Sequence, residues 1–497
     1  MRRRTALLVL PFVLSACGST VQYRGTQAAG DGLSADPGLQ TPAGTTTGTG
    51  TTGTAGALAP GGGPGGTGGA AGGTTGVAAP GGSTSATGGG AVPQGAALGS
   101  GPGYTSKEIR IGFSTSNDAG KVLGSAGLGV QIADQNQLVK VWLAKVNAAG
   151  GIAGRKVVPV FYDYKATGDL PTQDQAACAT WTQDTRVFAA TGVRAGTTGS
   201  GDNLTPCLAK SGVPWLAATG DDHKWQQYLP AMYSTGDMSR TREEKVLIES
   251  LAAQSFFGSG TKIGVVISDA TADMSRAVKE GMEPALARLG LTITRRIVIA
   301  NAQTESTNAE LQMFAAGVTH VLFAAPGGAA ASEFMLAAHS QQRTYHYGIS
   351  TQDVPGIAVQ TIAGSAQEQL RNARGYGYRP GFDVDSNNQP ADTPAMKSCF
   401  DYYKGKGFDT SSLNRAGMAL ICDSVNLLKQ SLEGQRSPSQ AGLGQAVAAL
   451  GTRFPVATTF TSAFSTQQHD GIGSYRFLTY DTGCSCFRYL GALRPTG

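Results

Sequence analysis

The stretch Asn147–Val157 (NAAGGIAGRKV) joins a predicted helix to a predicted strand. Four apolar residues before it recur at helical spacing, which predicts one buried helix face: Val139, Trp142, Leu143 and Val146. Gly150 and Gly151 supply the left-handed conformation in which helices commonly end, and Gly154 allows a tight turn. The β-branched and aromatic segment 157–164 (VVPVFYDY) then predicts a strand. The stretch therefore predicts a helix that returns to a parallel sheet through a short loop.

Strand and helix patterns alternate along most of the remaining chain. Strands are predicted at residues 108–113, 157–164, 187–193, 213–218, 262–268, 292–300, 320–325 and 346–350. Helices are predicted at residues 275–289, 305–316 and 329–341. Such alternation predicts an α/β fold of parallel sheets with right-handed crossovers. One doubly wound sheet would not comfortably hold all of these strands, so we expect two lobes. The alternation alone fits two tandem domains equally well.

The helix end NAAGGIAGRKV resembles a motif of the form INAxGGIxGxK in the type I solute-binding proteins of ABC transporters, within the leucine/isoleucine/valine-binding group. The resemblance extends, more loosely, from about residue 105 to the end of the chain. It implies two Rossmann-like lobes joined by a three-segment hinge, with crossings near residues 228–235, 350–356 and 452–459. The first lobe would comprise residues 104–232 and 354–455, and the second residues 233–353 and 456–497. Such a hinge would close the lobes over a ligand.

The N-terminus has the features of an export signal. Arg2–Arg4 form a positive segment, and Ala6–Leu14 is an apolar run too short to span a bilayer. Leu14–Cys17 (LSAC) resembles a bacterial lipobox, which implies removal of residues 1–16 and lipid attachment at Cys17. Acyl chains there would hold the protein at a membrane surface. The alternative is an ordinary signal peptide with an incidental cysteine.

The composition of the residues after this signal predicts a tether. Residues 17–103 consist mainly of Gly, Thr, Ala, Ser and Pro, and we expect them to be disordered because they cannot bury enough apolar surface to offset their ordering entropy. Removing Arg2–Arg4 from the 39 basic residues leaves 36 against 34 acidic ones, a net charge of +2. This balance does not suggest nucleic acid as a partner.

Six cysteines remain when Cys17 is set aside, and an exported chain favours their pairing. We favour pairs that are near in sequence: Cys178–Cys207, where the resembled family often has a bridge, Cys399–Cys422, and Cys484–Cys486. The last pair is doubtful because a bridge across one residue is strained. A metal or redox role is its alternative, although two sulfurs without nearby His or carboxylate groups make a poor metal site. We predict no metal and no cofactor.

Ligands of open α/β sheets bind at the carboxyl ends of strands. The loop at residues 194–200 offers backbone N–H groups and hydroxyls that suit a carboxylate or another anion. A solvated glycine-rich loop, with Asp202 as a helix cap, is an equal alternative from spacing alone. The resemblance favours the anion cradle, because the family holds a ligand carboxylate in this loop and in the next, where Ala217–Thr219 is similar to its Ala-Ala-Thr. The predicted ligand residues of the first lobe are Thr197, Thr198, Ser200, Ala218, Thr219 and Gln131, with a further contribution possible from the loop Ser114–Asp118.

The second lobe departs from the family pattern. Its predicted ligand residues are Asp273, Gly327, Gly328 and Ser350, at places where the family has aromatic or acidic residues. These departures weaken the case for an α-amino acid, and the small residues leave room for a bulkier ligand. Asp273 or Asp353 would be able to pair with a cation, but capping and turn roles are the commoner use of such residues.

No enzyme motif stands out. Residues 258–262 (GSGTK) precede a strand instead of following one, so they do not form a phosphate loop, and the five histidines lack metal spacing. We therefore predict a non-enzyme: an extracytoplasmic, lipid-anchored, monomeric solute-binding component of an ABC importer. It would capture a small polar ligand (amino-acid-like, amide or carboxylate) by hinge closure and deliver it to a membrane permease. The alternatives are a ligand-sensing receptor of the same fold that signals to a membrane partner and, third, an extracellular enzyme.

Overall fold

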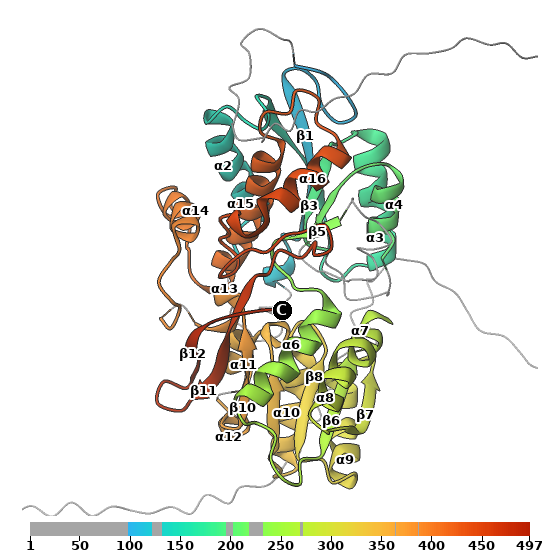
Figure 1. Ribbon diagram of the computed structural model, residues 1–497, viewed down its shortest axis with the longest axis vertical. Helices are drawn as coiled ribbons and strands as arrows, with labels where there is room; N and C mark the ends of the chain where they lie inside the picture. Colours follow the sequence, from blue (N-terminus) through green and yellow to red (C-terminus); the bar gives the residue numbers. More distant parts are fainter. Residues whose placement is uncertain are drawn as a thin grey trace, which may run out of the picture. The chain divides into compact units, whose positions relative to one another are not determined.

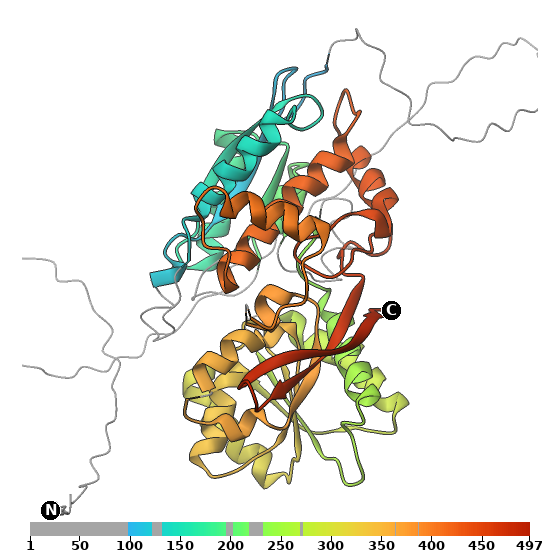
Figure 2. The same ribbon diagram turned by 90° about the vertical axis from the view of Figure 1, so that its left-hand side faces the viewer.

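The computed structural model describes residues 98–121, 132–194, 202–217, 232–268, 272–362, 364–385 and 387–497 (Figure 1). The predicted signal segment, Cys17 and nearly all of the tether lie outside these residues. The described chain forms two sheets, each with its own helices, and the sheet to which a segment belongs defines the first and second lobes (Figure 2).

The first lobe contains a five-stranded parallel sheet in the order β2-β1-β3-β4-β5. Its strands are β1 (Glu108–Thr115), β2 (Lys156–Asp163), β3 (Ala189–Gly192), β4 (Trp215–Ala217) and β5 (Met232–Ser234). The helices of this lobe are α2 (Gln135–Ala148), α3 (Leu170–Ala179), α4 (Leu204–Lys210), α14 (Pro394–Lys404), α15 (Ser412–Leu432) and α16 (Gln440–Leu450).

The link from α2 to β2 confirms the prediction made from Asn147–Val157. The Asn147 side chain accepts from the Val157 N–H (2.7 Å) and donates to the Val157 carbonyl (3.0 Å), so the end of the helix is fixed to the start of the strand. Gly151 has φ +72°, and a Cβ there would lie 1.8 Å from the carbonyl oxygen of Arg155. Any side chain at residue 151 would therefore displace the turn.

The second lobe contains a seven-stranded sheet in the order β12-β11-β10-β9-β8-β6-β7. Its strands are β6 (Ile263–Ser268), β7 (Ile293–Ile299), β8 (His320–Ala324), β9 (His346–Ile349), β10 (Ala373–Gly377), β11 (Ser474–Asp481) and β12 (Cys486–Pro495). The first five are parallel, whereas β11 and β12 run antiparallel as a hairpin. The predicted parallel sheets are confirmed for β1 to β10. The hairpin of β11 and β12 was not predicted, and it is antiparallel because a short turn can join only antiparallel strands.

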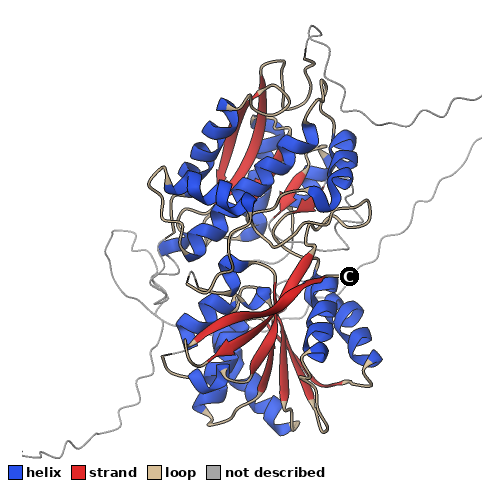
Figure 3. Ribbon diagram, turned by 60° about the vertical axis from the view of Figure 1, so that its left-hand side comes forward, coloured by secondary structure: helices blue, strands red, loops and turns tan. Residues whose placement is uncertain are grey.

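Helices cover both faces of the larger sheet (Figure 3). The helices of this lobe are α6 (Arg240–Ala253), α7 (Ala272–Ala277), α8 (Glu283–Arg288), α9 (Ala302–Ala315), α10 (Ala329–Ser340), α11 (Pro355–Ile362) and α12 (Gln367–Leu370). The short helix α13 (Pro380–Asp383) follows β10 and packs against α11 and against α15 of the first lobe. Within the described residues, no helix is both long and apolar enough to cross a bilayer.

The chain passes between the lobes three times, but two crossings fall later than predicted. Residues 354–377 were expected in the first lobe, yet β10 pairs with β9 in the larger sheet, and Ile362 and Leu370 are buried in that lobe's core. Conversely, residues 456–464 were expected in the second lobe, yet Val456 and Phe464 pack in the first core. β10 was not predicted because its sequence, ARGYG, contains no β-branched or large aliphatic residues, which are typical of strands.

All six cysteines of the folded region pair as favoured from the sequence. Cys178–Cys207 joins the end of α3 to α4, and Cys399–Cys422 joins α14 to α15 in the first lobe. Cys484–Cys486, the doubtful pair, closes the turn between β11 and β12.

Candidate ligand-binding site

A cavity of about 90 Å³ lies at the carboxyl ends of β1, β3 and β4 in the first lobe. It is lined by Phe113, Ser114, Thr115, Gln135, Leu138, Val139, Thr191, Gly192, Val193, Leu216, Thr235, Gly417, Leu420, Ile421 and Ser424. This is the edge of a parallel sheet at which ligands bind. The cavity also adjoins a crossing between the lobes, since Thr235 directly follows β5.

Three elements form the walls of this cavity. The sheet contributes the last residues of β1 and β3, and the first turns of α2 contribute Leu138 and Val139. The remaining wall is α15, whose Gly417, Leu420 and Ile421 share one helix face at positions i, i+3 and i+4. Most of the lining is therefore apolar.

The hydroxyls and the amide around the cavity are largely engaged within the protein. Thr191 donates to the Leu216 carbonyl (3.1 Å), and Ser424 donates to the Ile421 carbonyl (3.3 Å). The Gln135 amide accepts from the Ser116 N–H at 2.9 Å. Because these groups already have hydrogen-bond partners in the protein, a ligand does not need polar atoms to satisfy them.

The predicted anion cradle lies next to this cavity along the chain. Thr197, Thr198, Ser200, Ala218, Thr219 and Gln131 themselves lie outside the described residues, so their roles remain predictions. Val193 and Leu216, which line the cavity, lie shortly before the two predicted loops. Of the Ser114–Asp118 loop, Ser114 and Thr115 are cavity residues.

Arg194 is a residue of this region that the sequence did not single out. Its guanidinium binds the fully buried carboxylate of Asp174 and lies 3.6 Å from Asp202. Arg194 is the first residue of the predicted loop and Asp202 lies two residues after its last, so their ion pair joins the two ends of that loop. Asp202 also accepts from the Thr205 N–H (2.9 Å), which agrees with its alternative interpretation as a helix cap.

The predicted ligand residues of the second lobe have local structural partners. Ser350 is fully buried, and its hydroxyl accepts from the Gln352 N–H at 3.2 Å in a capping box with Asp353. Gly328 has φ +78°, and a Cβ there would lie 2.4 Å from the Asp353 carbonyl oxygen. Burial raises the pKa of Asp353 well above its ordinary value, which disfavours the charge that a cation would need.

Gly327 and Asp273 complete this predicted set. Gly327, at φ +96°, precedes the N-cap of α10, and Asp273 on α7 lies 4.0 Å from Arg276. The structure thus shows a backbone role or a nearby protein contact for each of Gly327, Asp273, Gly328 and Ser350. Their contact with ligand remains a prediction. Among the described residues, no group of three His, Cys, Asp or Glu side chains is placed to hold a metal ion.

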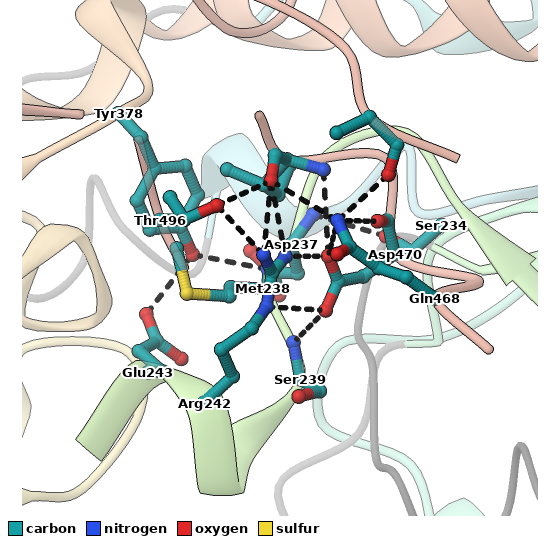
Figure 4. A network of polar contacts seen from close by, with 12 residues as sticks. Ser234, Asp237, Met238, Ser239, Arg242, Glu243, Tyr378, Gln468, Asp470 and Thr496 are labelled. Carbon is teal, nitrogen blue, oxygen red and sulfur yellow. Dashed lines mark hydrogen bonds and ion pairs between the residues drawn. The ribbon is translucent and has the colours of Figure 1, made fainter. Parts of the chain in front are cut away.

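A polar network ties the chain crossings together (Figure 4). Asp470, between α16 and β11, is ion-paired with Arg242 of α6 and accepts from the Ser239 N–H at 2.8 Å. Arg242 also donates to the Ile472 carbonyl (3.1 Å) and to the Thr496 hydroxyl (2.7 Å). These contacts connect the first crossing, the third crossing and the end of β12.

The second crossing joins the same network. Tyr378, directly after β10, accepts from the Met238 N–H (3.3 Å) and donates to Glu243 (2.9 Å). Arg379 is ion-paired with Asp237 at 2.6 Å, and both side chains are about 10% exposed. Burial, partly opposed by Arg240, raises the pKa of Glu243 to about 7. Buried ionic and hydrogen-bonded groups therefore fix all three crossings to one another.

Two α/β lobes, a three-segment hinge and a cavity at the strand ends define a two-lobed ligand-binding protein. A sequence profile described as periplasmic binding protein matches residues 109–485, and the chain belongs to this family. It is a solute-binding protein of the type I periplasmic binding fold. The family consists of binding proteins and is not a family of enzymes. Membership of a periplasmic binding family implies an extracytoplasmic location.

Solved structures with the same fold have low sequence identity to the chain. An ABC transporter substrate-binding protein from Desulfitobacterium hafniense in complex with Leu is 17% identical, with a TM-score of 0.54, over 77% of this chain and 100% of that one. A branched-chain amino acid ABC transporter protein from Thermus thermophilus with bound valine is 14% identical, with a TM-score of 0.59, over 78% and 97%. A fatty acid ABC transporter substrate-binding protein from Thermomonospora curvata is 17% identical, with a TM-score of 0.58, over 80% and 95%. No sequence among curated proteins matches the chain.

Proposed function

We propose that this protein is the lipid-anchored binding component of an ABC importer and captures a small organic ligand by hinge closure. The observation that carries the proposal is the cavity at the carboxyl ends of β1, β3 and β4, beside the first crossing. A ligand seated there lies next to the chain segments that must rotate when two lobes close. The resemblance of the N-terminus to a lipobox supports anchoring at Cys17, with residues 17–103 as the tether.

In this mechanism the first lobe holds the ligand before closure. Its anionic or carbonyl group would accept hydrogen bonds from the cradle containing Thr198 and Thr219, and the remainder of the ligand would face the cavity. The second lobe then covers it, and the closed form is the one that a permease recognises. The network around Arg242 and Asp470 would set the axis of this motion, because it fixes the crossings to one another.

Ligand binding is tested on the mature chain after removal of any co-purified ligand. A thermal-shift screen would cover amino acids, amides, short-chain carboxylates, small aromatic compounds and sugars. At a ligand concentration 100 times the dissociation constant, binding should stabilise the native state by about 2.7 kcal/mol. Thr198→Ala and Thr219→Ala should weaken a hit, whereas Thr482→Ala, an exposed threonine in the β11–β12 turn, should not. A hit equally strong in all variants would contradict the cradle.

Transport and anchoring need separate readouts in cells. Deletion of the gene should abolish uptake of the labelled hit, and restoring the gene should recover it. Cys17→Ala should move the protein from the membrane fraction to the soluble exported fraction. Normal uptake without the protein would contradict the importer role, and unchanged membrane association of Cys17→Ala would contradict the anchor.

A further inference from the structure

The cavity in the first lobe has a chemical character that narrows the ligand class. We infer that the ligand carries an alkyl or aryl group that enters the space between β1, β3 and α15, and that it lacks an α-ammonium group. This inference rests on the proposed solute-binding role and specifies its substrate.

The first observation is the lining of the cavity. The cavity is lined by the apolar side chains of Phe113, Leu138, Val139 and Leu216, each at most 3% exposed. The Ser114 hydroxyl lies 3.4 Å from the Thr191 carbonyl, to which it donates. A hydrocarbon group can therefore fill the cavity without leaving the lining hydroxyls of Ser114 and Thr191 unpaired, whereas a polar group would find few partners there.

The second observation is the position of Gly417 in α15. A Cβ built on Gly417 meets no atom within 4 Å, although this residue lines the cavity. Glycine in a helix interior costs stability relative to alanine, so it is an unfavourable choice for helix formation alone. Its missing side chain leaves space beside Leu420 and Ile421, on the same helix face. An apolar cavity of about 90 Å³ is of a size that holds a small hydrocarbon group.

The third observation concerns carboxylates among the described residues of both lobes. An α-ammonium group needs a carboxylate or several carbonyl oxygens as partners once it is removed from water. Among the described residues, Asp163 is ion-paired with Lys165 (2.6 Å), and Asp174 is bound by Arg194. Asp353 is 1% exposed and accepts from the Ser350 N–H at 2.8 Å. Asp118 accepts from the Ala166 N–H (3.0 Å), and Asp273 lies 4.0 Å from Arg276. Each of these five carboxylates therefore already has a partner within the protein.

The test is isothermal titration calorimetry on the mature, ligand-depleted chain with matched probes. Butanoate, pentanoate and hexanoate measure the alkyl contribution, and each added methylene should tighten binding about fourfold until the cavity is full. Leucine and 4-methylpentanoate differ only in the ammonium group, as do phenylalanine and 3-phenylpropanoate. The ammonium-free member of each pair should bind at least about tenfold more tightly, because a buried ammonium without a partner is costly.

Gly417→Leu places a side chain in the cavity, and Gly417→Ala is its matched control. Both substitutions favour the helix, so both variants should melt at or above the temperature of the wild type. Gly417→Leu should weaken binding of hexanoate and 4-methylpentanoate at least about tenfold. Gly417→Ala should retain butanoate and pentanoate binding.

The outcomes separate failure of this inference from failure of the proposed function. If a ligand from the broader screen binds the wild type and Gly417→Leu equally, the cavity is not its subsite. Tighter binding of leucine than of 4-methylpentanoate overturns the ligand class and leaves the solute-binding role intact. Absence of any hit in the broad screen instead overturns the proposed ligand capture, and normal uptake of a hit after gene deletion overturns the importer role.

Discussion

Replacing Arg242 with alanine should destabilise the protein by about 3 kcal/mol, because the change leaves a buried carboxylate without its cation. The side chain of Asp470 is 1% exposed and that of Arg242 is 12% exposed. Breaking a buried ion pair by removing one partner costs about 3–5 kcal/mol. The lower end applies because Asp470 keeps the Ser239 N–H at 2.8 Å.

The loss is measured by urea unfolding and by calorimetry. A loss of about 3 kcal/mol should lower the melting temperature by about 6–12 °C for domains of this size. Arg288→Ala is the matched control, since its pair with Glu249 is exposed on both sides and should contribute at most about 1 kcal/mol.

A double-mutant cycle tests whether the unpaired carboxylate of Asp470 causes the loss of stability in Arg242→Ala. Asp470→Asn removes that charge, so Arg242→Ala combined with Asp470→Asn should be less destabilised than the sum of the two single variants. Additive losses, or an Arg242→Ala variant no less stable than Arg288→Ala, would refute this account of the network.

Three further perturbations test other parts of the structure. Gly151→Ala should prevent normal folding, since its Cβ would lie 1.8 Å from a backbone oxygen, whereas Gly150→Ala at φ +92° meets no neighbour within 4 Å and should only lower the melting temperature modestly. Burial raises the pKa of Glu244 well above its ordinary value, so the folded state keeps a proton that the unfolded chain releases. This contribution to stability is complete below the ordinary pKa of glutamate and is lost as the pH rises above it towards the folded value. Glu244→Gln should therefore gain stability relative to the wild type as the pH rises above about 5 in urea titrations, by at most about 1.4 kcal/mol per pH unit, and a constant difference would contradict the shift. Replacing Cys178 and Cys207 together with serine opens a bridge with a sequence separation of 29 and should cost about 3.5 kcal/mol in thermal unfolding, while an unchanged melting temperature would show that the bridge adds nothing.

The sequence was most informative where the structure depends on neighbouring residues. The helix end at Asn147–Val157, the strands β1 and β8, and the α/β alternation are set by periodicity and turn chemistry within short windows. The cysteine pairs were favoured because their partners are near in the chain, and the structure contains all three.

The candidate site was predictable only in part. The rule that ligands bind at the carboxyl ends of strands pointed to the loops after β3 and β4, and the cavity lies at these strand ends. The contribution of α15 was not predicted, although Gly417, Leu420, Ile421 and Ser424 have the spacing of one helix face. That spacing indicates a shared face, but it does not tell what the face contacts.

The α/β class and the turn after α2 could be predicted from the sequence because they depend on local conformational preferences, whereas the ligand residues named from the sequence remain predictions. Three features became clear only from the packed fold: β10 belongs to the larger sheet, β11 and β12 are antiparallel, and Arg242 contacts Asp470. Arg242 and Asp470 are 228 residues apart in sequence, and no local pattern relates them. Their contact depends on the packing of the complete fold. This packing brings together chain segments whose sequences do not indicate that they are neighbours.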